Sequence, residues 1–336
     1  MKICANCFRD EEIKSFINSE SKEKGKCDYC LEESSLLDIK ELLDFFSGYM
    51  RIFNEDPSGV RLMELIQSDW SLFVNDATGT LVLRDILSFL SSPLSPETIV
   101  SYLPEIKECV SYWETLKKEL KGKTRFLTSI EQLQEYQWDS LLCVFSEIDK
   151  SFIFYRARIN SNGENRPISI GEMGCPPQHL ATEGRANPYG IPYLYLCKHL
   201  ETTLYETRSL YLDILSIATF KVKDGVFKLV DFTNNQSPLN YDDMIQQTKG
   251  RLLRKAISND LSKPMRRFDS ILEYIPTQFI CEYIRYNTGA DGIQFNSSLH
   301  KEGVNVVIFD GAKMECLTVD AFQIESVKIV SRILGR

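Results

Sequence analysis

Residues 172–195 read EMGCPPQHLATEGRANPYGIPYLY, and the chain changes character around this stretch. The stretch is rich in proline and glycine, and it has no apolar run before its last residues, which predict a strand at 194–196. Irregular segments are costly to order, and ordered ones often shape a binding site. Within it, Gly184-Arg185-Ala186-Asn187-Pro188 places a guanidinium and an amide on a turn, and a guanidinium is a bidentate partner for phosphate.

Short strands and helices are predicted on both sides of this stretch, from about residue 150 onward. Arg156 and Arg158 alternate on or just after the first strand, so we expect their side chains on one face. Asp224-Gly225 between two apolar runs is a hairpin signal. The pattern predicts a mixed α/β domain over residues 149–336, with strands at 152–155, 194–196, 218–222, 226–231, 292–296, 304–309 and 323–330, and helices at 201–211 and 271–286.

Residues 34–148, ahead of this domain, carry the apolar spacing of helices. Ser34 and Ser35 are suitable N-caps for an i, i+3, i+4, i+7 pattern that runs to Phe46. Residues 60–74 repeat the pattern, and residues 105–120 form a further amphipathic segment with Gly122 as its stop signal. We therefore expect an all-helical region here, and an α+β chain as a whole.

Residues 1–33 contain two C-x2-C pairs, Cys4 with Cys7 and Cys27 with Cys30, separated by nineteen residues. Each close pair can hold one side of a tetrahedral ion, and the two pairs complete a four-sulfur site. So short a segment cannot bury a core alone, as is usual for a metal-stapled module. A redox role for one pair is less favoured, because no βαβ context surrounds it. We expect a structural zinc knuckle, without the open position that catalysis needs.

The composition of the chain indicates which kinds of partner and compartment to expect. The net charge of −8 and the pI near 5.2 argue against a dedicated nucleic-acid binder. No apolar stretch reaches the roughly 18 residues of a membrane span, and the N-terminus has no apolar core of a signal peptide. We expect a cytoplasmic protein, in which the other six cysteines are reduced thiols. These are Cys109, Cys143, Cys175, Cys197, Cys281 and Cys316.

An ordered set of motifs in the C-terminal part resembles the RES family. The motifs are FYRAR at 154–158, EMGCPP at 172–177, GRANPYGIPYLY at 184–195, TTLYETRS at 202–209, DGIQFNSS at 291–298 and VNVVIF at 304–309. Their order and spacing match the family across nearly all of residues 150–310. RES domains are toxins of bacterial toxin–antitoxin systems, and the helical region at 34–148 is similar to the HEPN-like domain that precedes some of them.

The resemblance implies a fold similar to that of ADP-ribosyltransferase toxins, with NAD as the substrate. Members cleave the nicotinamide–ribose bond with phosphate or water as acceptor, and some transfer ADP-ribose to proteins. The family's two arginines match Arg156 and Arg185, and its glutamate matches Glu206. Its tyrosine matches Tyr195, and its serine matches Ser297. We expect catalytic roles for Arg156, Tyr195, Glu206 and Ser297, and NAD-binding roles for Arg156, Arg158, Arg185 and Asn187.

The chain departs from the family around its serine. Ser298 adjoins Ser297, which leaves the register open by one residue. Many relatives have an arginine soon after the serine, where this chain has Leu299 and His300, and Lys301 is a candidate replacement for that phosphate contact. A longer insertion also separates the first arginine from the glycine-arginine turn.

These residue types suit the cleavage of NAD. The departing nicotinamide leaves an oxocarbenium-like ribose, whose charge a carboxylate at Glu206 can stabilise. Arginines can hold the pyrophosphate and fix the geometry of the ribose. We therefore expect an NAD-consuming toxin that causes growth arrest.

The sequence disfavours several other classes of enzyme and leaves two alternative functions open. No arginine precedes any histidine at the spacing of a HEPN ribonuclease, and no G-x-S-x-G, P-loop or G-x-G-x-x-G motif occurs. The alternatives are an ADP-ribosyltransferase that acts on a protein or nucleotide, or an inactive RES-like regulatory protein. A cognate antitoxin or inhibitor protein and self-association into a homo-oligomer are the expected partners, and no membrane is involved.

Overall fold

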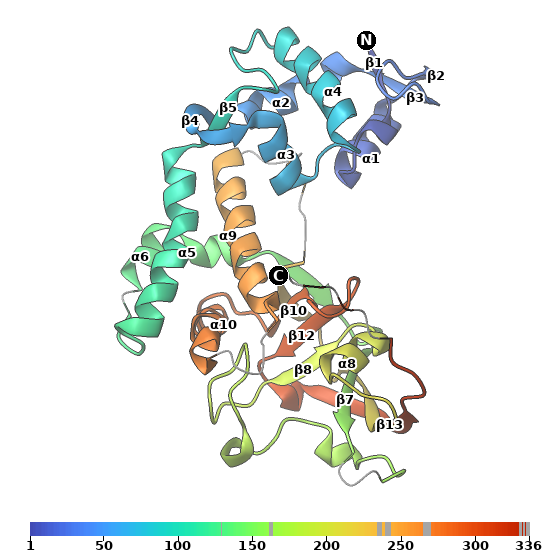
Figure 1. Cartoon of the computed structure of the whole chain (residues 1–336), viewed down its shortest axis with the longest axis vertical. Helices are drawn as coiled ribbons and strands as arrows, with labels where there is room; N and C mark the ends of the chain where they lie inside the picture. The colour runs from blue at the N-terminus through green and yellow to red at the C-terminus, as the bar shows by residue number, and fades with distance from the viewer. Residues whose placement is uncertain are drawn as a thin grey trace. The chain divides into compact units, whose positions relative to one another are not determined.

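The computed structural model describes residues 1–128, 130–160, 164–233, 237–238, 243–264, 270–328, 331 and 333. The chain divides into two compact units (Figure 1). The first comprises Met1–Tyr112 and Asn235–Leu253, and the second comprises Trp113–Asn234 and Arg254–Arg336. The division falls within helices α5 (Pro104–Gly122) and α9 (Met244–Ser262), so each of these helices contributes residues to both units.

The first unit begins with a three-stranded antiparallel sheet in the order β1-β3-β2. The strands are Lys2–Ile3, Glu33–Asp38 and Glu23–Lys26, respectively. Helix α1 (Glu11–Glu20) connects the first and second strands in the chain. Asp10 caps this helix by accepting a hydrogen bond from the Ile13 backbone N–H, and the helix buries Ile13 and Ile17 in the core of the unit.

The rest of the first unit packs helices around an aromatic core. Tyr49 lies edge-on to Trp70, and Phe46 stacks on Phe73. The elements are α2 (Leu43–Met50), β4 (Phe53–Arg61), α3 (Leu62–Trp70), α4 (Asp76–Phe89) and β5 (Ile99–Tyr102).

Residues 34–148 are therefore not all helical, and that part of the expectation is wrong. Ser34 and Ser35 lie in β3 instead of capping a helix, and α2 begins only at Leu43. Strands β4 and β5 pair with each other, and β6 (Phe145–Ile148) joins the large sheet of the second unit. Helices are confirmed within 60–74 and 105–120, as α3 and α5. The strand partners are distant in the chain, so local apolar spacing could not reveal them.

The second unit is a mixed α/β structure, as expected. Its eight-stranded sheet has the order β13-β9-β7-β8-β12-β11-β10-β6, and among these pairs β10–β11 is parallel and the others are antiparallel. Residues of β9 and β10 share one hydrophobic core although four strands separate them in the sheet, so the sheet curls around that core. The strands, in sheet order, are Met314–Gln323, Ile214–Val222, Phe154–Ile159, Leu194–Cys197, Val304–Ile308, Gly292–Asn296, Phe227–Asp231 and Phe145–Ile148. The helices lying wholly within the unit are α6 (Glu131–Glu135), α7 (Trp138–Leu142), α8 (Leu200–Glu206) and α10 (Ile275–Asn287).

Two predicted features of this unit are wrong. The chain bends at Asp224-Gly225, where Gly225 has a φ of +77°, but the strands on either side of the bend do not pair as a hairpin. Strand β9 pairs with β7 and β13 while β10 pairs with β6 and β11, because both strands are largely buried and each needs two neighbours. The strand predicted at 323–330 ends at Gln323 as part of β13, and Ile329 and Val330 lie outside the described residues.

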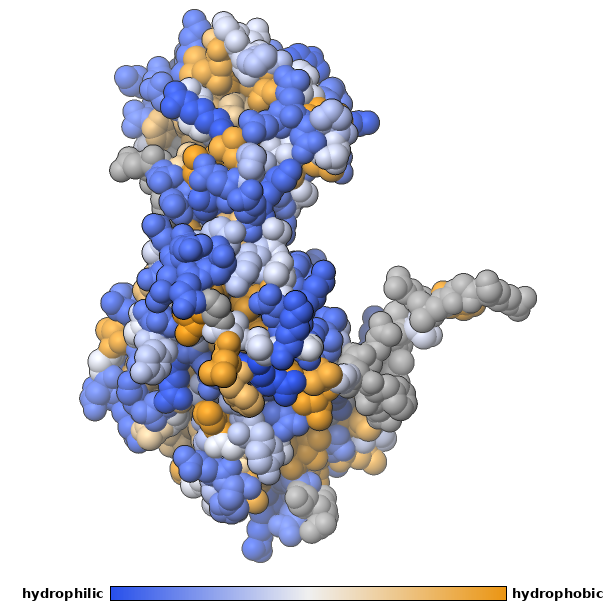
Figure 2. Space-filling model, turned by 90° about the vertical axis from the view of Figure 1, so that its left-hand side faces the viewer, coloured by the Kyte–Doolittle hydropathy of each residue, from blue (hydrophilic) through white to orange (hydrophobic). Residues whose placement is uncertain are grey.

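One face of the molecule is mostly polar. Figure 2 shows hydrophilic residues over most of the viewed face, with apolar residues in small groups among them. In the described part of the chain, no helix combines the length and apolar character that a membrane crossing requires.

Candidate functional site

A cavity of about 310 Å³ lies in the second unit where strands β7 and β8 part. These strands share a single pair of opposed residues, Tyr155 with Cys197. The same row continues across the sheet, because Cys197 is opposite Asn305 on β12, and Asn305 is opposite Phe295 on β11. All four residues of this row line the cavity. The floor of the cavity is thus built from residues in register on four adjacent strands.

Helix α8 forms one wall of the cavity. Thr203, Glu206 and Thr207 line it, and their i, i+3, i+4 spacing places them on one face of the helix. The end of α9 contributes Leu261 and Ser262 to another wall.

Arg156 reaches the cavity from β7. Its guanidinium donates a 3.4 Å hydrogen bond to the carbonyl oxygen of Tyr195. Burial, together with the neighbouring charge of Arg158, lowers the pKa of Arg156 to about 10. The group therefore keeps its positive charge at neutral pH in a poorly hydrated place, where an anionic ligand would gain most from it.

Arg185 reaches the cavity from the irregular segment at 172–195, and contacts with α9 and α10 hold its turn in place. Its guanidinium donates to the carbonyl oxygen of Leu261 at 2.6 Å. From α10, the Thr277 hydroxyl donates to the Arg185 carbonyl oxygen at 2.6 Å, and the Gln278 amide donates to the Gly184 carbonyl oxygen at 2.8 Å. Burial lowers the pKa of Arg185, and Glu206 is among the groups that favour its charged form.

Tyr195 locks the glycine-arginine turn in place. Its hydroxyl donates to Asn187 Oδ1 at 2.7 Å and accepts from the Ala186 backbone N–H at 3.0 Å. The Asn187 amide donates in turn to three backbone carbonyl oxygens, those of Thr182, Pro188 and Ile191. Asn187 is 4 % exposed and does not line the cavity, so it shapes the segment that carries the arginine.

This lock explains why the turn has a glycine. A Cβ atom at Gly184 would lie 2.6 Å from the Tyr195 hydroxyl and 2.7 Å from Asn187 Oδ1. We expect Gly184→Ala to lower the free energy of unfolding by about 1–3 kcal/mol, because the network must shift to admit the methyl group. Urea unfolding of the full chain measures the effect.

Gly174→Ala is the matched control for that experiment. Gly174 lies in the same segment, and a Cβ atom there would meet nothing within 4 Å. Equal urea midpoints for the two variants would contradict the proposed close packing at Gly184.

Glu206, the last residue of α8, is held by two donors that reach the same carboxylate oxygen. The Ser297 hydroxyl donates to Oε1 at 2.6 Å, and the Asn305 amide donates to Oε1 at 2.8 Å. Ser297 also accepts hydrogen bonds from the backbone N–H groups of Leu299 and His300, both at 3.1 Å. Its lone pairs and its proton are therefore all in use, and its role in this geometry is to hold Glu206.

The cavity unites some of the predicted residues and leaves others outside. Arg156, Arg185, Tyr195 and Glu206 line it, and Ser297 contacts it through Glu206, whereas Ser298 lines it directly. Arg158 lies on the same side of β7 as Arg156, but it donates to the Gly174 carbonyl oxygen and is not in the lining.

His300 and Lys301, which follow the serine where many relatives have an arginine, make no contact with the cavity. The ring of His300 stacks on Tyr205 with centroids 4.9 Å apart, and its Nδ1 lies 2.9 Å from the Thr202 hydroxyl. Neither His300 nor Lys301 lines the cavity. The site residue that sequence reasoning missed is Asn305, and its signal was a lone polar residue inside the apolar run VNVVIF.

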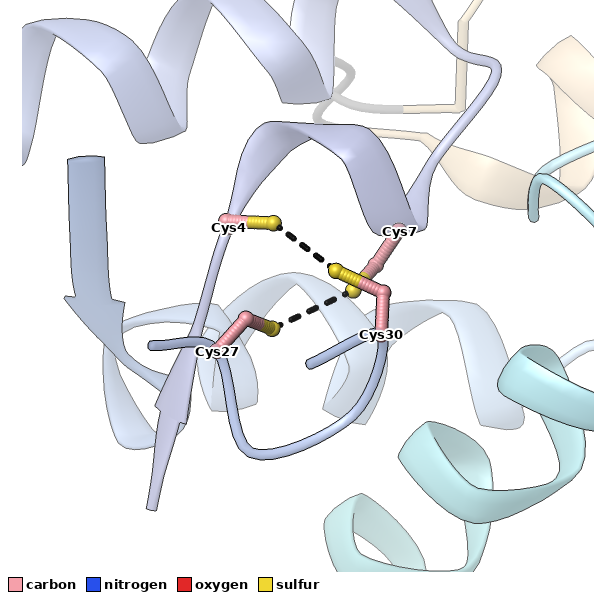
Figure 3. A group of neighbouring side chains, drawn as sticks. All are labelled: Cys4, Cys7, Cys27 and Cys30. Carbon is pink, nitrogen blue, oxygen red and sulfur yellow. Dashed lines mark hydrogen bonds between the residues drawn. The ribbon is translucent and has the colours of Figure 1, made fainter. Parts of the chain in front are cut away.

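The four N-terminal cysteines form a second candidate site in the first unit. Figure 3 shows Cys4 and Cys7 at the two ends of one turn and Cys27 and Cys30 on a loop, with their sulfur atoms facing one another. All four sulfur atoms lie within 4.8 Å of one another, with 3.4 Å between Cys4 and Cys30 and 3.6 Å between Cys7 and Cys27. Four sulfur atoms bound to one zinc ion at about 2.3 Å would lie about 3.8 Å apart, so the cluster fits tetrahedral zinc.

The protonation chemistry of the cluster also suits a cation. The hydrogen bond from the Cys7 thiol lowers the pKa of Cys27 to about 4, whereas burial raises the pKa of Cys4 to about 12. Four thiolates at this spacing, three of them buried, need a cation to neutralise them. A bound zinc ion would supply that charge and cross-link the two ends of residues 4–30.

Comparison with known proteins gives one match. The model of the RES domain matches residues 153–328, slightly more than half of the 336 residues. No curated protein and no solved structure matches the chain. The match covers β7 through β13 and every residue that lines the cavity, so the chain belongs to the RES-domain family.

Proposed function

We propose that this protein is an NAD-consuming enzyme that cleaves the nicotinamide–ribose bond and thereby arrests growth. The observation that carries the proposal is the cavity that brings Arg156, Arg185 and Glu206 together in a chain of the RES-domain family. Two half-buried guanidinium groups suit the pyrophosphate of a dinucleotide. A carboxylate held by two donors suits the cationic ribose of the transition state.

The reaction breaks the bond between C1′ of the ribose and N1 of nicotinamide. The bonding electron pair leaves with nicotinamide, which becomes neutral, so the departing group needs no proton from the enzyme. Positive charge then develops on the ribose, and the Glu206 carboxylate can stabilise it through a ribose hydroxyl. Water or phosphate then adds to C1′ and releases a proton.

The test is to incubate the purified, zinc-loaded protein with NAD, with and without phosphate, and to follow nicotinamide release. The proposal expects release in at least one condition, and no release from a folded sample would contradict it. NAD that carries a label in its ADP-ribose part separates the possible acceptors. Free ADP-ribose or its phosphate supports hydrolysis or phosphorolysis, whereas label on a protein or nucleotide would identify a transferase.

An enzyme of this kind would need restraint in the cell that makes it, so the proposal includes an antitoxin or inhibitor protein as partner. Expression in a bacterial host tests the growth effect directly. The wild-type chain should slow growth, while a variant without the Glu206 carboxylate should not.

A further inference from the structure

Asn305 stands out in β12 because it is a polar residue in a strand whose other residues are valine and isoleucine. Its strand pairs with β8 on one side and β11 on the other, which places Asn305 between Cys197 and Phe295. A side chain in this row points into the cavity floor. An asparagine here needs hydrogen-bond partners, and it has one on each end of its amide.

The two donors on Glu206 fix the rotation of its carboxylate. Asn305 Nδ2 and the Ser297 hydroxyl both reach Oε1, at 2.8 Å and 2.6 Å. Among the residues that the structure describes, no donor has a hydrogen bond to Oε2. One oxygen is thus occupied by the protein, and the other remains available to a ligand in the cavity.

Cys197 determines which way the Asn305 amide faces. Its thiol donates to Asn305 Oδ1 at 3.4 Å, which leaves the NH2 group facing Glu206. Burial raises the pKa of Cys197 to about 12, and the Glu206 carboxylate acts in the same direction. The thiol therefore keeps its proton at neutral pH and remains a donor, whereas a flipped amide would set Oδ1 against the carboxylate.

We propose that Asn305, with its amide oriented by Cys197, is a positioning residue that directs Glu206 Oε2 toward the ribose of the substrate. The inference rests on the proposed function, because it assigns a task to the same carboxylate. A carboxylate free to rotate would spend less time in the productive orientation, so the cost falls on the chemical step more than on binding.

The experiment compares Asn305→Leu and Asn305→Asp with the wild-type chain in nicotinamide release over a range of NAD concentrations. Asn305→Leu keeps the size of the side chain and removes the donor, so kcat should fall about 10- to 100-fold while KM changes little. Asn305→Asp places a like charge beside Glu206, so the acid limb of the pH–kcat profile should move to higher pH.

Thr219→Val is the matched control. It removes a side-chain hydrogen bond of the same sheet, between the Thr219 and Thr318 hydroxyls at 2.8 Å, and neither of these residues lines the cavity. Its kcat should equal that of the wild type.

The outcomes distinguish failure of the positioning role of Asn305 from failure of the proposed function. Wild-type kcat in Asn305→Leu, or an equal loss in kcat and in NAD affinity, would overturn the positioning role and leave the proposed function standing. If Asn305→Leu does not fold, an unshifted acid limb in Asn305→Asp would overturn it instead. No release from the wild-type chain would overturn the proposed function and this inference with it.

Discussion

Glu206→Gln is expected to lower kcat for nicotinamide release by about 10²–10³-fold, which corresponds to about 3–4 kcal/mol of lost transition-state stabilisation. Glutamine has the shape of glutamate, and its Oε1 can still accept from Ser297 and Asn305, whose bonds to Glu206 are 2.6 Å and 2.8 Å long. The substitution therefore removes the charge and keeps the geometry. Because the charge acts on the ribose only as the bond breaks, NAD affinity should change little.

Single-turnover and steady-state release of nicotinamide, together with calorimetric titration of NAD, measure the two quantities separately. Glu201→Gln is the control, since Glu201 lies on the same helix, is exposed and does not line the cavity. Wild-type kcat in Glu206→Gln, from an active parent enzyme, would show that another group stabilises the transition state. Equal toxicity of the parent and Glu206→Gln in a bacterial host would argue against the growth-arrest mechanism.

The motifs of the sequence selected four residues that line one cavity, but they did not indicate what each side chain contacts. Arg156 comes well before the other three, Arg185, Tyr195 and Glu206, and all four line the cavity. Spacing alone could not show that Asn187 faces the turn instead of the cavity, since that depends on three backbone carbonyl groups and the Tyr195 hydroxyl. Nor could it reveal Asn305, which becomes meaningful only when strand register sets it beside Cys197.

The same difference between local and distant contacts explains which elements of the fold could be predicted from the sequence. Helices such as α5 carry their own periodic signal and were predicted. Strand β3 pairs with residues 2–3 and 23–26, and β4 pairs with residues 99–102, so their patterns were mistaken for helix. The chain bends at Asp224-Gly225 without forming the predicted hairpin, because burial of β9 and β10 decided which strands they pair with.

Removal of zinc from the four-cysteine cluster should lower the stability of the first unit by more than Gly184→Ala lowers that of the second. Cys4, Cys7 and Cys27 have no exposed surface and belong to the core cluster of that unit, together with Ile3, Phe8 and other apolar residues. Structural zinc sites in small modules contribute about 10–16 kcal/mol at neutral pH, which is comparable to the whole stability of a domain of roughly 5–15 kcal/mol. We therefore expect Cys27→Ser, or treatment with a strong chelator, to unfold the first unit.

Metal analysis by mass spectrometry and hydrogen exchange of the full chain measure this prediction. The wild type should carry one zinc ion per chain, and in the zinc-free protein the amides of α1 and the β1-β3-β2 sheet should lose protection first. Cys143→Ser is the control, because Cys143 is an exposed thiol of the second unit, outside the cluster. Every residue that lines the cavity lies in the second unit, so nicotinamide release should outlast the loss of protection in the first. Immediate and reversible loss of NAD cleavage on chelation, with both units still protected, would instead assign the metal a direct part in the chemistry.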